Sequence, residues 1–277
     1  MKAARSYLFV PASRPERIAK ALASGADAVV VDLEDAVPPE AKATARAQLQ
    51  AWLEGPQAAP VVLRINGCDT QEFGDDLALC RHPQVAAVML PKAERPEDIA
   101  RVADTGRPVL ALVETAAGID ALRAIASAPG VQRLVFGSID FQLDLGIDGE
   151  GEELLFFRSQ IVLASRLARL QPPVDGVSTA LDDEALLRAD SERARRLGFG
   201  AKLCIHPRQV TAVNAAFTPD AQAVQWAQRV LQAAADAGGA AVALDGRMID
   251  KPVILRAQDI LARAGQQTPT PPKETNP

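Results

Sequence analysis

With 277 residues, the chain is long enough to form either one large barrel or two ordinary domains. Its shares of hydrophobic residues (48%) and charged residues (23%) are typical of a globular protein, and no apolar run could span a bilayer, so we expect a soluble protein without membrane contact. A net charge of −5 without a cluster of Lys and Arg argues against binding to nucleic acid.

Short β-branched apolar runs alternate with amphipathic segments along most of the chain, which is typical of βα units. The first residues lack the pattern of a secretory signal, so we expect a cytoplasmic protein. In chain order, we predict strands and following helices at 6–11 and 17–24, 28–33 and 40–53, 60–65 and 73–80, 86–91 and 97–103, 109–113 and 119–127, 133–136 and 152–170, 174–178 and 184–197, and 202–205 and 210–216. Eight such units predict an α/β fold, a (β/α)8 TIM barrel over residues 1–218.

The remaining chain exceeds what a minimal barrel needs. An amphipathic helix is predicted over residues 219–237, ended by Gly238 and Gly239, and a final helix runs to about Ala264. We therefore expect residues 219–265 to form a C-terminal helical extension or lid. Residues 266–277 are rich in Pro, Thr and Gln and are expected to be a disordered tail.

Charged residues gather at the predicted strand ends, where barrel enzymes place their active sites. In chain order they are Asp32, Glu34, Asp35, Arg64, Lys92, Glu114, Asp140 and Asp175. Any one of them is explained equally well as the solvated start of a loop. That reading explains the whole ring poorly, so we expect all of them to face one mouth of the barrel.

Two carboxylates of this ring suit a metal ion. Glu114 and Asp140 end consecutive predicted strands, so they could converge on one divalent cation. The chain has only two histidines, and hard oxygen donors suit Mg²⁺, with Mn²⁺ as a substitute, rather than zinc. The alternative is that these carboxylates cap helices or pair with Arg.

Arg64 leaves an apolar strand, where an unpaired guanidinium would be costly. Its partner is expected to be a substrate carboxylate, or a protein carboxylate such as Glu34 or Glu114. His206 is read as a structural residue beside Pro207 more readily than as a base. A Schiff base on Lys92 or Lys202 is the second choice. Neither a dinucleotide-binding glycine motif nor a serine-hydrolase elbow is present.

Several motifs, taken in order, point to a known family. They are Phe9–Arg17, Gly25–Val37, Leu63–Asn66, Pro91–Lys92, Val113–Thr115, Phe136–Asp140, Ile205–Gln209 and Met248–Asp250. Over nearly its whole length the chain resembles the citrate lyase β-subunit-like branch of the HpcH/HpaI aldolase/citrate lyase family, which includes citryl-CoA and malyl-CoA lyases.

The resemblance implies roles for individual residues. Glu114 and Asp140 would be the Mg²⁺ ligands, and Arg64 would bind the substrate's carboxylate and carbonyl. The remaining implied assignments are Glu34 and Asp35 supporting the metal's water shell, Arg14 approaching the phosphates of coenzyme A, and Asp250 reaching a neighbouring subunit's site from the lid. The resemblance further implies a homotrimer or hexamer.

The expected enzyme is a Mg²⁺-dependent carbon–carbon lyase. It would cleave or form a β-hydroxyacyl-CoA such as citryl-CoA or malyl-CoA, giving a keto acid and an acyl-CoA, with coenzyme A as the substrate carrier. Asp250 would exchange a proton with the acyl methyl carbon. Two alternatives stay open at this point: a CoA-independent, metal-dependent aldolase on hydroxy-keto acids, and a non-catalytic subunit that binds metal and CoA. The acyl group and the physiological direction also stay open.

Overall fold

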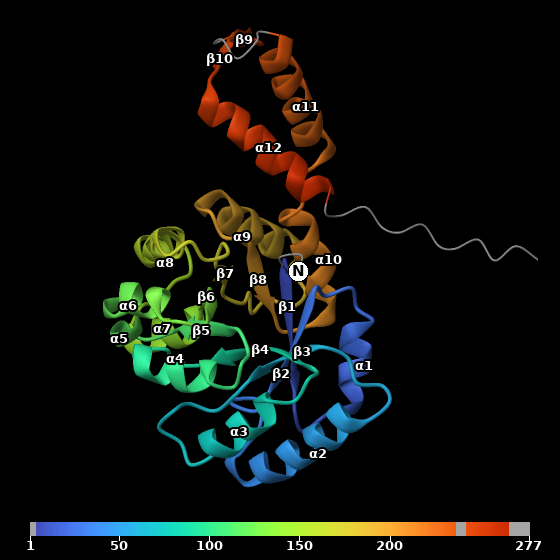
Figure 1. The fold of residues 1–277 in the computed structure, drawn as a ribbon, viewed down its shortest axis with the longest axis vertical. Helices are drawn as coiled ribbons and strands as arrows, with labels where there is room; N and C mark the ends of the chain where they lie inside the picture. Colours follow the sequence, from blue (N-terminus) through green and yellow to red (C-terminus); the bar gives the residue numbers. More distant parts are fainter. Residues whose placement is uncertain (1–3, 237–241, 266–277) are drawn as a thin grey trace, which may run out of the picture. The chain divides into compact units, whose positions relative to one another are not determined.

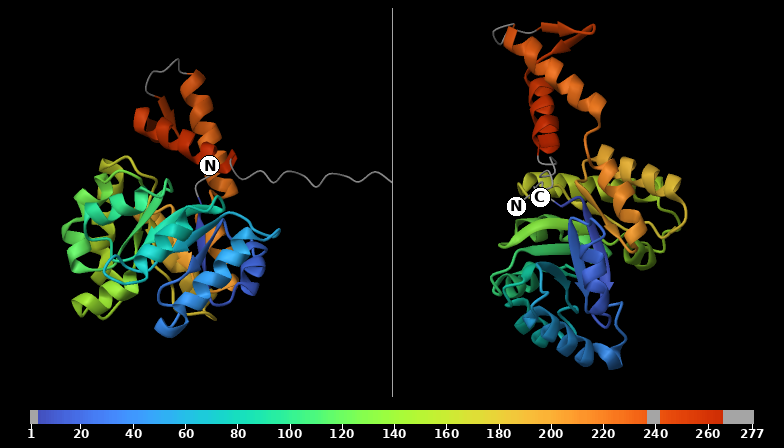
Figure 2. Two further views of the ribbon diagram at one scale, coloured as in Figure 1. Left: turned by 60° about the horizontal axis from the view of Figure 1, so that its bottom comes forward. Right: turned by 90° about the vertical axis from the view of Figure 1, so that its right-hand side faces the viewer.

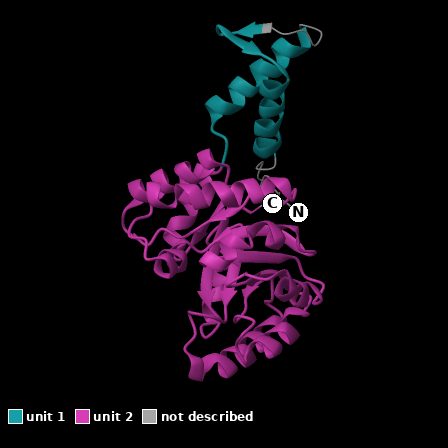
Figure 3. Ribbon diagram, turned by 90° about the vertical axis from the view of Figure 1, so that its left-hand side faces the viewer, with its two compact units in different colours: residues 1–2, 218–277 teal, residues 3–217 magenta. Residues whose placement is uncertain are grey.

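The computed structural model describes residues 4–236 and 242–265. The chain divides into two compact units, residues 3–217 and residues 218–277 together with 1–2 (Figure 3). The expected helix end at Gly238 and Gly239 and the expected disorder of residues 266–277 lie outside the described residues.

The larger unit is a closed barrel of eight parallel strands in sequential order, with helices around it (Figures 1 and 2). The strands are β1 (Ser6–Pro11), β2 (Ala28–Asp32), β3 (Val61–Arg64), β4 (Val85–Leu90), β5 (Val109–Val113), β6 (Val131–Phe136), β7 (Val174–Asp175) and β8 (Ala201–Cys204). β8 pairs with β1, which closes the sheet. The predicted TIM barrel is thus confirmed.

The helices of this unit follow the strands in the expected alternation. They are α1 (Glu16–Leu22), η1 (Pro39–Ala41), α2 (Lys42–Glu54), α3 (Phe73–Cys80), α4 (Pro96–Ala103), α5 (Ala116–Asp120), α6 (Leu122–Ser127), α7 (Ser138–Leu145), η2 (Glu152–Leu154), α8 (Leu155–Leu167), α9 (Glu184–Leu197) and α10 (Pro207–Ala216). One helix, α7, was not predicted. β6 ends at Phe136, so Asp140 lies on the first turn of α7 and not on an extension of the strand.

Two apolar layers hold the barrel together. The larger lies between strands and helices, and the smaller fills the barrel interior with Tyr7, Val30, Val62, Ala87, Met89, Leu110, Leu112, Val135, Val174, Ala201 and Leu203. Alternate strand residues point to the same side. Asp32, Arg64 and Glu114 each stand two residues after an interior residue, so they also face the barrel axis at its C-terminal end.

The smaller unit contains a helical hairpin with a short β-hairpin between its helices: α11 (Ala221–Asp236), β9 (Val242–Leu244), β10 (Arg247–Ile249) and α12 (Lys251–Gly265). The two strands were not predicted, although Asp245 and Gly246 form a strong hairpin signal, and both have positive φ (51° and 72°). A small apolar core built around Val230 and Ile249 packs the helices together. None of the described helices is long and apolar enough to cross a membrane.

Candidate active site

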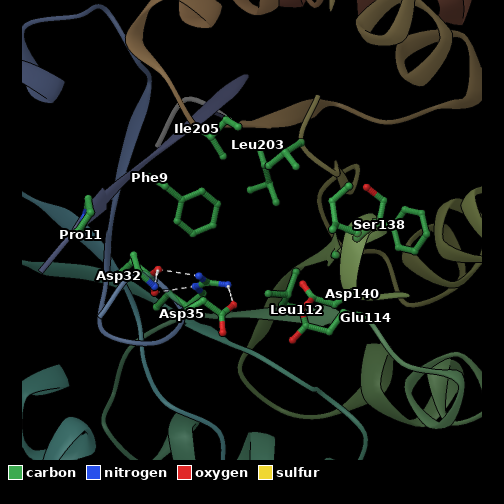
Figure 4. Close-up of a pocket in the computed structure, with 16 residues that line it drawn as sticks. Phe9, Pro11, Asp32, Asp35, Leu112, Glu114, Ser138, Asp140, Leu203 and Ile205 are labelled. Atoms are coloured by element: carbon green, nitrogen blue, oxygen red, sulfur yellow. Dashed lines mark hydrogen bonds and ion pairs between the residues drawn. The ribbon is translucent and has the colours of Figure 1, made fainter. Parts of the chain in front are cut away.

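A cavity of about 410 Å³ lies at the C-terminal mouth of the barrel (Figure 4). Its polar lining comes from Asp32, Asp35, Arg64, Glu114, Ser138 and Asp140. Phe9, Leu203 and Ile205 line the side opposite the carboxylates in this view. An apolar wall facing a few convergent charges is typical of a small-molecule site.

Arg64 is the central cation of the cavity. Its Nε and Nη2 donate to the two carboxylate oxygens of Asp32 at 2.7 and 2.6 Å. Its Nη1 lies 3.1 Å from Glu34 Oε2 and 3.2 Å from Asp35 Oδ2. The guanidinium also stacks on Phe9, with 4.9 Å between its carbon and the ring centroid. An incoming carboxylate must therefore compete with Glu34 and Asp35 for Arg64.

The partner of Arg64 was only partly anticipated. Glu34 was an expected partner and is one, whereas no ion pair joins Arg64 to Glu114 among the described interactions. The strongest partner is Asp32, to which sequence reasoning assigned no role beyond the ring of charges. Asp32 is 1% exposed and also accepts the backbone N–H groups of Glu34 (2.9 Å) and Ala36 (3.0 Å). It therefore shapes the segment that carries Glu34 and Asp35.

Carboxylates outnumber cations in and around the cavity. Burial, with added repulsion from Glu34 and Asp140, raises the pKa of Glu114 to about 8. Burial likewise raises the pKa of Glu34 to about 7, and burial with the charge of Asp35 raises the pKa of Asp140. A cation placed among these groups would relieve their repulsion.

The geometry around Glu114 fits a hard cation. Its Oε1 accepts the N–H of Lys92 at 2.8 Å, and the side chains of Glu114 and Asp140 lie next to one another (Figure 4). A Cβ on Gly137 would lie 2.5 Å from Glu114 Oε2, so only glycine permits this approach. Among the described residues, no three His, Cys, Asp or Glu side chains form a metal-binding group. The two carboxylates would thus share Mg²⁺ with water or substrate oxygens, as Mg²⁺ usually requires.

The prediction that the whole ring faces the mouth was wrong for Asp175. Val174 points into the barrel, so Asp175 points outward and pairs with Arg158 of α8 (2.9 Å) and with Lys202 (3.7 Å). Lys202 is 1% exposed and does not line the cavity, and Lys92 has an exposed side chain. The geometry therefore offers no support for a Schiff base on either lysine.

His206 has a structural role, as favoured from the sequence. It is the N-cap of α10: its Nδ1 accepts the N–H of Arg208 at 3.2 Å, and the side chain of Gln209 accepts the N–H of His206 at 3.3 Å. This reciprocal pair is a capping box.

A second, basic groove adjoins the cavity. It has a volume of about 880 Å³ and shares Phe9, Pro11 and Ile205 with the cavity lining, so it begins at the cavity rim. Its cations are Arg14, Arg17, Lys20 and Arg208. Only Arg14 was singled out from the sequence, and it forms an ion pair with Glu16 at 2.6 Å. Arg17 and Lys20 lie three residues apart on α1 and so share a face of that helix, but Arg208 comes from α10, and sequence spacing alone did not bring it to them.

Asp250 belongs to the smaller unit. It is exposed and directly precedes α12, where its Oδ1 accepts the N–H of Val253 at 3.3 Å and its carbonyl accepts the N–H of Ile254 at 3.0 Å. These bonds make it a helix cap, and among the described residues its Oδ2 has no hydrogen-bond partner.

Comparison with known proteins connects this geometry to a family. The model of the HpcH/HpaI aldolase/citrate lyase family matches residues 5–207. A citrate lyase subunit beta-like protein of Deinococcus radiodurans is 40% identical over 275 residues, covering 93% of this chain and 96% of the relative. A (3S)-malyl-CoA thioesterase of Cereibacter sphaeroides is 34% identical over 269 residues, covering 94% of each chain.

Solved structures agree. The crystal structure of protein CitE from Mycobacterium tuberculosis in complex with magnesium, acetoacetate and coenzyme A superimposes with a TM-score of 0.85 at 35% identity. The match covers 96% of this chain and 100% of that one. The resemblance identified from the motifs is thereby confirmed, and the chain belongs to the HpcH/HpaI aldolase/citrate lyase family.

Proposed function

We propose that this protein is a Mg²⁺-dependent carbon–carbon lyase that cleaves or forms a β-hydroxyacyl-CoA such as citryl-CoA or malyl-CoA. The observation that carries the proposal is the carboxylate pair of buried Glu114 and exposed Asp140, which line one cavity together with Arg64. The complex of the Mycobacterium tuberculosis relative with magnesium, acetoacetate and coenzyme A supports the same chemistry for this site. Mn²⁺ would replace Mg²⁺ because both prefer oxygen ligands.

The two adjoining hollows favour a substrate in two parts. The cavity of about 410 Å³ suits a small acid, and the groove of about 880 Å³ carries the cations that a phosphorylated carrier needs. Arg14, half exposed and next to Glu16, is positioned to exchange that partner for a phosphate of coenzyme A. A free hydroxy-keto acid would leave this groove unused.

The residues of the chain divide the work of bond cleavage. Arg64 would hold the substrate carboxylate and donate to the carbonyl oxygen that forms, after Glu34 or Asp35 yields its place. A carboxylate of the cluster would accept the hydroxyl proton, and Glu34 and Asp35 would hold the metal's water molecules. The Mg²⁺ ion supplies electrostatic stabilisation of the negative charge that develops on oxygen.

The named relatives leave room for hydrolysis. The Cereibacter sphaeroides relative is a malyl-CoA thioesterase, so thioester hydrolysis is a second candidate activity of the same site. Release of a keto acid and release of a free thiol tell the two reactions apart.

The first prediction concerns substrate class. Purified protein with Mg²⁺ is expected to release a keto acid from citryl-CoA or malyl-CoA, but not from free hydroxy-keto acids. Glu114→Gln should fold normally yet lose about 10³-fold or more in turnover, because a metal ligand contributes several kcal/mol. Keto-acid release coupled to a dehydrogenase measures both. Keto-acid release only from free acids would indicate the CoA-independent aldolase. Release of free thiol without a keto acid would indicate the thioesterase. No release of either product would indicate a non-catalytic subunit.

The second prediction concerns pH. The native pKa of Glu114, about 8, lies above its usual value of 4.5, so the folded protein holds a proton that the unfolded chain releases between these values. The stability of the metal-free protein should therefore fall as pH rises from about 5 to 8. Mg²⁺ binds the charged form, so the gain in Tm on adding Mg²⁺ should grow over the same range.

Differential scanning fluorimetry at several pH values measures that gain. Glu114→Gln, which cannot titrate, should show little Mg²⁺ effect at any pH and a flatter pH dependence without metal. A Mg²⁺ effect of constant size from pH 5 to 8.5 would contradict the metal assignment of Glu114.

The third prediction concerns the basic groove. Arg14→Ala should raise KM for the CoA thioester about three- to tenfold with little change in kcat, the effect expected of one solvent-exposed charge on a phosphate. Arg188→Ala, which removes an exposed cation of α9 outside the groove, serves as the matched control. Equal KM values for the two variants would remove Arg14 from the substrate site.

The fourth prediction concerns Asp250 and the proposed homotrimer or hexamer. If Asp250 acts in a neighbouring copy, co-expression of Asp250→Asn with Glu114→Gln should restore activity that neither variant has alone. A site is intact when one copy supplies Glu114 and its neighbour supplies Asp250. With random assembly of equal amounts into a cyclic oligomer, about a quarter of the sites meet this condition. Turnover per site, with particle mass from light scattering, checks both claims. Absence of recovery in a confirmed mixed oligomer would mean that Asp250 does not act between copies.

A further inference from the structure

A chain of four polar residues, two buried and two half-buried, lies behind the cavity, and the proposed reaction makes no use of it. Its members are Lys42 and Arg46 of α2, Asn66 just after β3, and Asp76 of α3. None of the four lines the cavity. Asp76 is fully buried and Asn66 is 2% exposed.

Asp76 anchors this chain. Its Oδ2 accepts both the backbone N–H of Asn66 (2.9 Å) and the side-chain Nδ2 of Asn66 (2.7 Å). Its Oδ1 accepts Nε of Arg46 at 2.7 Å. Three donors thus hold the Asp76 carboxylate, and two of them fix Asn66, two residues after Arg64.

Lys42 and Asn66 bind the backbone of the segment of residues 32–36, which carries Glu34 and Asp35, on the side away from the cavity. Lys42 Nζ donates to the carbonyl oxygens of Leu33 (3.0 Å) and Glu34 (2.9 Å) and to Asn66 Oδ1 (2.5 Å), so its three hydrogens are all used. Asn66 Nδ2 donates to the same Leu33 carbonyl at 3.1 Å. These bonds hold the carbonyl side of the segment that carries the acidic residues.

The cavity side of the same segment is held by Asp32, which accepts the N–H groups of Glu34 and Ala36. The segment is therefore fixed through its carbonyls on one side and its N–H groups on the other. Its side chains Glu34 and Asp35 contact Arg64 at 3.1 and 3.2 Å. A shift in the segment would move these partners and alter how Arg64 presents its donors.

We propose that Lys42, Asn66 and Asp76 are positioning residues that fix the segment from Asp32 to Ala36 and thereby orient Arg64 toward the substrate. The inference rests on the proposed function of the cavity. It assigns the three residues an effect mainly on substrate handling. The two proposed direct metal ligands, Glu114 just after β5 and Asp140 on α7, lie outside this network, and Glu34 and Asp35 would reach the metal only through water.

The matched pair Asp76→Asn and Asp75→Asn tests the proposal. Arg46 contacts both carboxylates, but Asp75 is 74% exposed and touches neither Asn66 nor the segment. An amide at position 76 offers one acceptor oxygen where two are used, so a donor of Asn66 or Arg46 loses its partner. We expect Asp76→Asn to lower kcat/KM for the CoA substrate about ten- to hundredfold, the cost of misplacing a binding group.

Three further readouts separate positioning from loss of fold. The Mg²⁺ concentration for half activation should change less than about threefold. Hydrogen exchange measured by mass spectrometry should accelerate in the peptide covering residues 32–36, while other barrel strands keep their protection. Asp75→Asn should match the wild type in every assay.

Lys42→Met and Lys42→Arg supply the second pair. The methionine variant loses all three hydrogen bonds and should reproduce both the kinetic loss and the faster exchange, and the arginine variant should recover part of each. Absence of lyase activity in the wild type would refute the proposed function alone. Faster exchange confined to residues 32–36 in the variants would still support the positioning role. Unchanged exchange in that peptide, or equal kinetics for the Asp76 and Asp75 variants, would overturn it.

Discussion

The ion pair between Arg64 and Asp32 is the interaction on which the site depends. Both residues end adjacent strands and face the barrel axis, where a guanidinium without a partner would be costly. The two parallel hydrogen bonds fix the plane of the guanidinium, and stacking on Phe9 fixes its face. Asp32 simultaneously orders the loop that follows it, so the same carboxylate organises the cation and its acidic neighbours.

The charge of the cavity is expected to differ between the metal-free and the metal-bound protein. Three carboxylates surround Arg64 while Glu114 and Asp140 stand nearby with raised pKa values. A divalent cation would offset the excess of negative charge and attract Glu34 and Asp35. Arg64 Nη1 would then be free to donate to a substrate carboxylate in their place. Metal binding and substrate binding would thus assist each other through one set of acidic side chains.

Sequence patterns revealed the parts of this structure that depend on local periodicity. The eight strands followed from apolar runs, and the ends of the predicted strands placed Arg64 and Glu114 at the mouth. Partners across the fold were not visible from the sequence: Asp32 for Arg64, and Arg158 for Asp175, which points outward because the preceding Val174 points into the barrel. The helix α7 was missed because its apolar start after β6 resembles a longer strand. The network of Lys42, Asn66 and Asp76 joins three elements, so no single stretch of sequence discloses it.

The most direct test of the account is anomalous diffraction from crystals soaked with Mn²⁺ in place of Mg²⁺. The account predicts one strong anomalous peak in each barrel, within coordination distance of Glu114 and Asp140 and facing Arg64, and no such peak in Glu114→Gln crystals. A peak at another position, or equal occupancy of this position in the variant, would contradict the claim that these two carboxylates form the metal centre.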